Sequence, residues 1–325
     1  MRSYLDVTCH YISVDNFTLC SSLLCCTRFS GSHTGDRIAS EIESLLDVYG
    51  IKQKVDYFIT DNAANMKKAF TVTFMNNGDA ADDNESDESD VEHPEMWENV
   101  DETTEQEILA TLTSHAHNER LSCFDHTLHL VVGDGLKDTK CVSASLAKCC
   151  KISSLLHTSS LFCDSFENAF GHNVSISAAV STRWNSTLRQ IKSIVALDAK
   201  QLSDVLEQQG QKNLVFSARE FSQLNELIEI LDPFLEATSL TEGNKVATIS
   251  YVVPSVLSLI NHLQDERPRV KYCTPICYSL LASMNNRFDG ILQRCQVPIK
   301  QRGSDINSLP YGSEIYILSA FFDPK

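Results

Sequence analysis

The stretch from Val55 to Met66 constrains the fold of this chain more than any other part of the sequence. Residues 55–59 are apolar at most positions, a polar turn follows, and a segment of helical composition begins at Ala63. A short apolar strand of this kind is typical of a sheet that is buried on both faces. We therefore expect Asp61 at the C-terminal end of a central strand, where polar side chains of α/β sheets project into a ligand-binding crevice.

Two interpretations of Asp61 follow from this position. A carboxylate here suits Mg²⁺, which takes oxygen ligands and often needs only one or two of them from protein. The plainer interpretation is that Asp61 or Asn62 caps the helix that follows. The spacing alone does not separate the two.

The residues before this stretch predict a hairpin, a helix and a strand. Apolar and polar side chains alternate over residues 4–12, which predicts a half-buried strand, and a second strand is expected over residues 17–29. A helix with one apolar face should then run from about Gly35 to Gly50, because glycine commonly ends helices in the left-handed conformation.

The net charge of the chain is concentrated in one segment. The chain carries a formal charge of −16, and residues 79–107 hold fourteen acidic side chains and no Lys or Arg. We expect a disordered loop over residues 76–113, because such a run repels itself and buries little apolar area. The remainder is close to neutral, unlike the strongly basic surface of an independent DNA-binding domain.

The cysteine pattern and the hydropathy of the sequence limit the classes of protein to which the chain can belong. The twelve cysteines are scattered, often beside apolar residues, and are expected to be reduced. We predict no membrane partner, because no apolar run approaches the roughly 18 residues that a span needs.

The run from Arg120 to Val132 holds Cys123, His126 and His129. These residue types suggest zinc, but structural zinc needs four ligands that usually come in two spaced pairs, and no second pair is found. A strand that enters a helix is the plainer interpretation. From residue 141 onward the sequence is helical in pattern, with a helix expected from Trp184 through Leu206 and another that opens at the capping box Ser217–Glu220. Pro233 is expected to kink or interrupt that second helix.

Five motifs in this order resemble those of hAT-superfamily transposases, most closely the domesticated zinc finger BED domain-containing proteins. The quoted segments are ITDNAANMKKAF, the Cys123 and His126 pair, STRWNST, LNELIEILDPFLEATSL and LSAFFDPK. The resemblance implies a ribonuclease-H-like fold in which two aspartates and a glutamate surround divalent metal. Asp61 matches the second aspartate of that set.

The resemblance also implies DNA-binding residues. Cys123 and His126 match a motif that is thought to help handle transposon-end DNA. Trp184 matches a tryptophan that stacks on a flipped base, and Arg183 is placed to contact phosphate. The alternative is that Trp184 anchors the core and Arg183 is a surface residue.

The fold class expected from these features is α/β, an incomplete ribonuclease-H-like fold with a large all-α insertion. Its parts are residues 1–75, the acidic loop 76–113, a continuation at 114–140 that holds the Cys123 motif, and the helical insertion 141–325. In the family, the first aspartate lies on a strand that would precede Met1, and the glutamate and the dimerisation region lie beyond residue 325. Asp61 would then be vestigial, and we expect no enzyme activity, no cofactor here (Mg²⁺ in intact family members) and no oligomer.

The function expected from the resemblance is that of a transposase-derived, catalytically inactive protein in the nucleus. It would act in transcription regulation through protein partners or through weak, non-specific DNA binding. One alternative is a fragment of an active transposase that lacks its ends. A second is a protein-interaction module with no role on nucleic acid.

Overall fold

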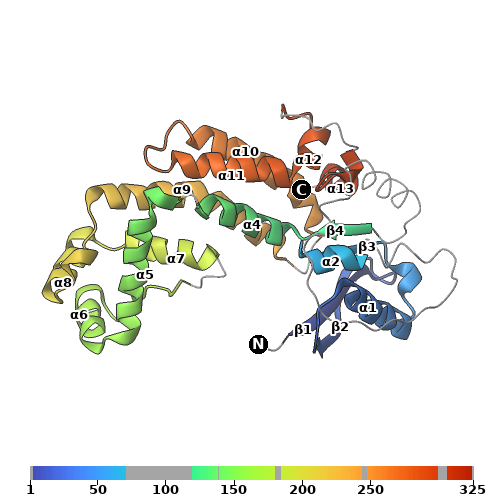
Figure 1. Ribbon diagram of the computed structural model, residues 1–325, viewed down its shortest axis with the longest axis horizontal. Coiled ribbons are helices and arrows are strands. Elements are labelled where there is room, and N and C mark those ends of the chain that lie inside the picture. Colours follow the sequence, from blue (N-terminus) through green and yellow to red (C-terminus); the bar gives the residue numbers. More distant parts are fainter. Residues whose placement is uncertain are drawn as a thin grey trace, which may run out of the picture. The chain divides into compact units, whose positions relative to one another are not determined.

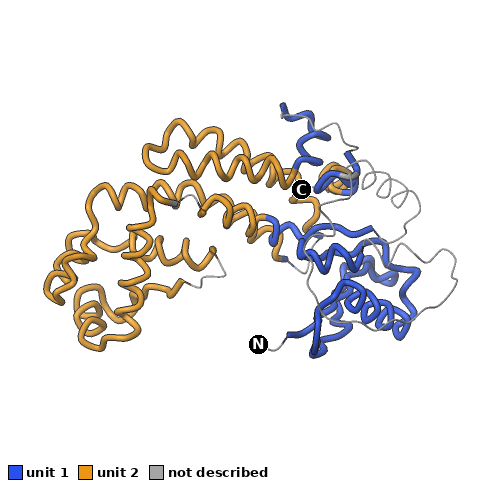
Figure 2. Tube along the Cα trace, in the orientation of Figure 1, with its two compact units in different colours: residues 1–127, 243–247, 289–315 blue, residues 128–242, 248–288, 316–325 orange. Residues whose placement is uncertain are grey.

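The computed structural model describes most of the chain, in two compact units (Figures 1 and 2). Unit 1 comprises residues 1–127, 243–247 and 289–315, and unit 2 comprises residues 128–242, 248–288 and 316–325. The described residues are 3–70, 119–137, 139–179, 184–243, 247–298 and 306–323. The expected acidic loop and Arg183 lie outside the described residues.

Unit 1 opens with the predicted hairpin. Strand β1 (Tyr4–Ile12) pairs antiparallel with β2 (Leu19–Arg28), so that Tyr4 lies opposite Arg28 and Ile12 opposite Leu19. The alternation of half-buried and exposed positions along the first part of β1 confirms a strand with one covered face. A register shift falls between Val7 and Thr8.

Helix α1 (Gly35–Tyr49) provides the centre of the unit 1 core. It ends as predicted at Gly50, whose φ of 62° is the left-handed conformation that glycine adopts without a Cβ penalty. Leu5 of β1 and Phe58 of β3 pack on the same core as the buried face of α1. That core consists of Phe29, Ile38, Ala39, Ile42, Leu46, Ala69 and Phe70.

Strand β3 (Tyr57–Thr60) precedes the turn at Asp61 and pairs in parallel with β4 (Glu119–Ser122). The short helix α2 (Ala64–Lys68) follows the turn. The prediction that this strand is buried on both faces is wrong, because Tyr57 is 42% and Ile59 is 67% exposed. Among the described residues each sheet has only two strands, so the core covers the Phe58 face and leaves the opposite face open.

Unit 2 is helical, in agreement with the pattern of the second half of the sequence (Figure 1). Helix α4 (Phe124–Lys137) begins in unit 1 and ends in unit 2. Helix α9 (Ala218–Thr241) packs against α5 (Ser143–Thr158), α7 (Trp184–Val195) and α10 (Val252–Glu266). The other helices of unit 2 are α6 (Ser160–Phe170), α8 (Ala199–Gln208), α11 (Thr274–Arg287) and all but the first residue of α13 (Ile315–Phe322). Its short 3₁₀ turns are η4 (Thr139–Cys141), η5 (Lys212–Leu214) and η6 (Ile249–Tyr251). Unit 1 also holds helix α12 (Asp289–Arg294) and the 3₁₀ turns η1 (Lys52–Lys54) and η7 (Ile306–Ser308).

Two helix boundaries differ from the prediction. The helix expected from Trp184 through Leu206 is two helices, because Asp198 caps α8 by accepting the Gln201 backbone N–H at 2.8 Å. Helix α9 opens with the predicted capping box, and of the two effects predicted for Pro233 the interruption is wrong, because the helix continues through it. The residue after the proline, Phe234, is fully buried, so tertiary packing retains the helix despite the lost backbone bond.

Candidate functional site

Asp61 lies directly after the last residue of β3, at the end of a strand as predicted, but among the described residues this strand pairs with β4 alone and is not central. Its Oδ1 accepts the backbone N–H of Ala63, the residue that caps α2, at 3.0 Å. This is a side chain-to-backbone turn that satisfies the start of the helix. One oxygen of the carboxylate therefore has a local structural partner.

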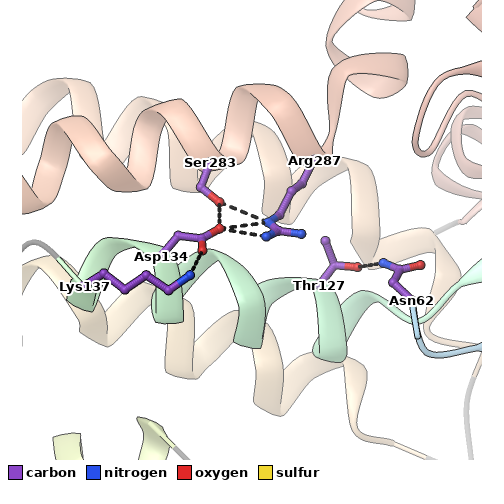
Figure 3. A network of polar contacts seen from close by, with 6 residues as sticks. All are labelled: Asn62, Thr127, Asp134, Lys137, Ser283 and Arg287. Atoms are coloured by element: carbon purple, nitrogen blue, oxygen red, sulfur yellow. Dashed lines mark hydrogen bonds and ion pairs between the residues drawn. The ribbon is translucent and has the colours of Figure 1, made fainter. Parts of the chain in front are cut away.

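Asn62 joins three elements of unit 1 around this turn. Its Oδ1 accepts hydrogen bonds from Arg120 Nη2 at 3.0 Å and from Ser122 Oγ at 2.8 Å, both on β4. Its Nδ2 donates to Thr127 Oγ1 on α4 at 3.1 Å (Figure 3). The amide suits this position because it offers an acceptor and a donor at once, which a carboxylate would not.

Arg120 fixes the end of β3 from the neighbouring strand. Its Nε donates to Thr60 Oγ1 at 2.7 Å, and its Nη2 donates to the carbonyl of Asp61 as well as to Asn62. The guanidinium thus binds three successive residues of the turn. Because these bonds involve a charged donor, they are stronger than neutral ones.

Cys123 links β4 to α4 beside the same turn. Its backbone N–H donates to the carbonyl of Thr60 at 2.7 Å, which continues the parallel pairing of the two strands. Burial raises the pKa of the Cys123 thiol, although backbone N–H groups of His126 and Asp125 act in the opposite direction. The negative charges of Asp125 and Asp61 raise that pKa further, so the side chain is a neutral thiol at pH 7.

Tyr311 returns to this site from a distant part of the sequence. Its side chain is buried, and its hydroxyl lies 2.8 Å from Thr127 Oγ1 and 3.1 Å from the carbonyl of Cys123. The backbone of Tyr311 has φ 60°, a conformation that is uncommon for a bulky residue. The neighbouring Gly312 approaches Gly290 so closely that a Cβ at Gly290 would overlap it, and a Cβ at Gly312 would overlap the carbonyl of Ile306.

The structure brings some of the predicted site residues together. Asp61 and Cys123 meet in unit 1, and His126 lies on the first turn of α4, half-exposed. Trp184 belongs to unit 2, where it begins α7 and is only 7% exposed. Arg183, the other residue of that motif, lies outside the described residues.

Sequence reasoning missed four contributors to this site, namely Asn62 in its hydrogen-bonding role, Arg120, Thr127 and Tyr311. Asn62 stands inside the quoted ITDNAANMKKAF segment and Arg120 opens the run to Val132 that holds Cys123, so their polar character at strand ends was a usable signal. Tyr311 is 184 residues from Thr127, and no local pattern indicates their contact.

The residues around Asp61 do not fit a two-metal centre. Such a centre needs several carboxylates to hold both ions across an in-line displacement. Within the part of the chain that the structure describes, no three His, Cys, Asp or Glu side chains gather in a way that could hold a metal ion. Among the described residues, Asp61 is surrounded by an amide, a guanidinium, hydroxyls and a thiol, and the carboxylate of Asp125 acts on the same thiol.

Residues 1–79 match the family model of the ZBED1 RNase-like domain. The matched segment contains the hairpin, α1, β3 and the turn at Asp61 and Asn62. The partners of this turn on β4 and α4, and Tyr311, lie outside the matched residues. The similarity supports an α/β domain of RNase-like type in unit 1, followed by a helical region.

A second comparison covers more of the chain. Over 275 residues, or 83% of its length, the chain is 22% identical to a protein of Talaromyces stipitatus named "Putative transcriptional regulator tpeD". The chain spans 31% of the length of that relative. Together the two similarities place the chain near ZBED-like, transposon-related proteins. No helix of the described residues is long and apolar enough to cross a bilayer.

Proposed function

We propose that this chain is part of a transposase-derived regulatory protein whose RNase-like unit contacts DNA or other proteins without cutting DNA. One observation carries the proposal. The segment that matches the RNase-like domain contains a turn where Asp61 and Asn62 are held by hydrogen bonds to a backbone amide, a guanidinium and hydroxyls. These hydrogen bonds hold the strand and the turn of the RNase-like segment in place, which is a structural role.

The absence of catalysis is part of this proposal. Only one carboxylate oxygen of Asp61 accepts the Ala63 N–H. The other oxygen could bind a single Mg²⁺ that keeps most of its water ligands, because such an ion needs only one or two protein ligands. Activation of both the attacking and the leaving oxygen requires further carboxylates close by. The described surroundings of Asp61 supply polar groups that position the chain, so we derive no catalytic step from them.

The proposed setting is the nucleus, in transcription regulation. The name of the Talaromyces relative supports this setting. Binding to DNA is expected to be weak and independent of sequence, because the chain outside residues 79–107 is near neutral and phosphate contacts dominate non-specific affinity.

A binding experiment tests the proposal. We expect the full chain to bind a fluorescent DNA duplex at about 50 mM salt and to release it as salt approaches physiological strength. Fluorescence anisotropy over a salt series measures this. No binding at low salt would reject the DNA-contact role and favour a module that binds only proteins. Tight binding that persists at physiological salt would show that the charge argument is wrong.

A further inference from the structure

One end of the helical unit 2 carries cations interleaved with aromatic rings. The connection between α10 and α11 contains Arg267, Arg269 and Lys271, followed directly by Tyr272. Arg219, the second residue of α9, reaches the same place, because its guanidinium carbon lies 5.1 Å from the centre of the Tyr272 ring.

Cation–aromatic contacts hold these charges at the surface. Lys271 Nζ lies 5.3 Å from the Tyr272 ring, and the Arg267 guanidinium lies 5.3 Å from the ring of Tyr278. Tyr278 is 56% exposed, although it stands on the well-packed helix α11. Such contacts order a cation without cancelling its charge.

The nearby acids are largely engaged elsewhere. Glu226 accepts the backbone N–H groups of residues 271, 272 and 273 at 2.8–3.0 Å, so its carboxylate is directed at the start of α11. Glu266 pairs with Arg269 at 3.0 Å. Asp265 is exposed beside them. Among the described residues, no ion pair involves Arg219, Arg267 or Lys271, and all three are exposed.

A fourth cation lies at the same end of the unit. The thiols of Cys141 and Cys273 lie close enough to act on each other's pKa, which places the 3₁₀ turn η4 beside the start of α11. Lys140 of that turn is exposed and is also without an ion pair among the described residues. Four cations and two tyrosines therefore share one surface.

We propose that this α10–α11 surface, defined as Lys140, Arg219, Arg267, Lys271, Tyr272 and Tyr278, binds the backbone and bases of single-stranded nucleic acid. Lys and Arg contact phosphates, and an exposed aromatic ring offers a face on which an unpaired base can stack. An acidic peptide would use the cations and leave Tyr278 without a role, so the rings favour nucleic acid. This inference rests on the proposed function and locates its nucleic-acid contact on the α10–α11 surface.

The test compares two triple variants that change the net charge equally. The first carries Arg219→Gln, Arg267→Gln and Lys271→Gln. The control carries Lys151→Gln, Arg189→Gln and Lys200→Gln, which are also exposed cations of unit 2 that make no ion pair among the described residues. Binding of fluorescent oligothymidine is measured by anisotropy across a salt series.

We expect the first variant to bind oligothymidine about tenfold or more weakly at low salt, with a slope of log K against log salt reduced by about two. The control should stay near the wild type. We expect the wild type to bind oligothymidine more tightly than duplex, and a Tyr278→Ser variant should lose this preference. Circular dichroism melting of each variant checks that the helical unit is folded.

The outcomes separate this inference from the proposed function. If the wild type binds DNA and the two triple variants lose affinity equally, the location is wrong and the proposed function stands. If the wild type binds neither duplex nor oligothymidine at low salt, this inference and the DNA-contact role of the proposed function both fail. Displacement of oligothymidine by polyglutamate as efficiently as by unlabelled oligothymidine would reject nucleic acid as the partner and indicate an acidic peptide.

Discussion

Asn62 is the residue on which the geometry of the candidate site depends most. It receives hydrogen bonds from Arg120 and Ser122 and donates one to Thr127, while Asp61 next to it makes only a local turn. The motif that suggests metal chemistry therefore contains a second residue whose role is to hold β3, β4 and α4 together.

Replacement of this amide tests that role. We expect Asn62→Ala to destabilise the chain by about 2–3 kcal/mol, because it leaves Arg120, a charged donor, short of an acceptor. Urea unfolding measures the change. Asn65→Ala is the matched control in the same motif, since Asn65 is exposed, and it should stay within about 0.5 kcal/mol of the wild type. Equal effects of the two changes would remove Asn62 from its structural role.

Trp184 is buried at the start of α7, a position expected of a core anchor. We predict that Trp184→Ala costs about 3–5 kcal/mol of unfolding free energy, because it leaves a large cavity. Trp184→Phe, which fills most of that cavity, should cost less than half as much. A loss below about 1 kcal/mol for Trp184→Ala would contradict the core interpretation and return the residue to the base-stacking role.

At the scale of elements, α4 packs closely against α11 within unit 2. A Cβ at Gly135 would overlap Leu280, which is fully buried, whereas a Cβ at Gly133 would meet nothing within 4 Å. The two glycines therefore have different roles in one helix.

A pair of alanine variants distinguishes these roles. Gly133→Ala should stabilise the chain by about 0.5–1 kcal/mol through helix propensity alone. Gly135→Ala gains the same propensity but overpacks against Leu280, so we expect a net destabilisation of about 1 kcal/mol or more. Thermal melting of both variants measures the difference. Stabilisation by both would mean that the helices separate freely at this point.

An ion pair joins the same two helices. Asp134 Oδ2 accepts hydrogen bonds from Arg287 Nη2 at 2.7 Å and from Ser283 at 2.9 Å, and Oδ1 accepts one from Lys137 (Figure 3). Partial burial acts to raise the pKa of Asp134, but the hydrogen bonds from Lys137, Arg287 and Ser283 outweigh it and lower the pKa to about 2.

This lowered pKa predicts an acid dependence of stability. A carboxylate whose folded pKa lies below its unfolded value of about 4 contributes fully above pH 4, and the contribution is lost as pH falls towards 2. At pH 7, Asp134→Asn should be less stable by about 1 kcal/mol, a modest value because the side chain is 31% exposed. The gap should close below pH 4. Asp204→Asn on the exposed side of α8 is the control, and a gap that does not depend on pH would contradict the assignment.

Local patterns predicted the elements of unit 1 well and their environment less well. The alternation in β1 and the glycine end of α1 depend on neighbouring residues, as does the Ser217–Glu220 capping box of unit 2, and the structure confirms all three. The exposure of Ile59 and the burial of Tyr311 depend on which strands and segments come together far apart in sequence. For the same reason the sequence placed Asp61 and Cys123 near one site but did not indicate that Tyr311 completes it.

At the scale of the whole molecule, the chain divides into two units that differ in secondary structure. Unit 1 holds both sheets and the segment similar to the RNase-like domain, and the described residues of unit 2 form helices and connecting segments without a strand. Unit 1 is assembled from three stretches of sequence, and residues 289–315 bring Tyr311 to the site. The RNase-like segment thus lies in unit 1, and the proposed single-strand surface lies in unit 2.

The central claim is that this architecture is retained without nuclease chemistry. The most direct measurement is incubation of the full chain with nicked, flapped and duplex DNA in Mg²⁺ or Mn²⁺, followed by denaturing electrophoresis. The account predicts intact DNA from the wild type and from Asp61→Ala alike. Metal-dependent cleavage by the wild type that Asp61→Ala abolishes would contradict it and would identify the chain as a working part of an active transposase.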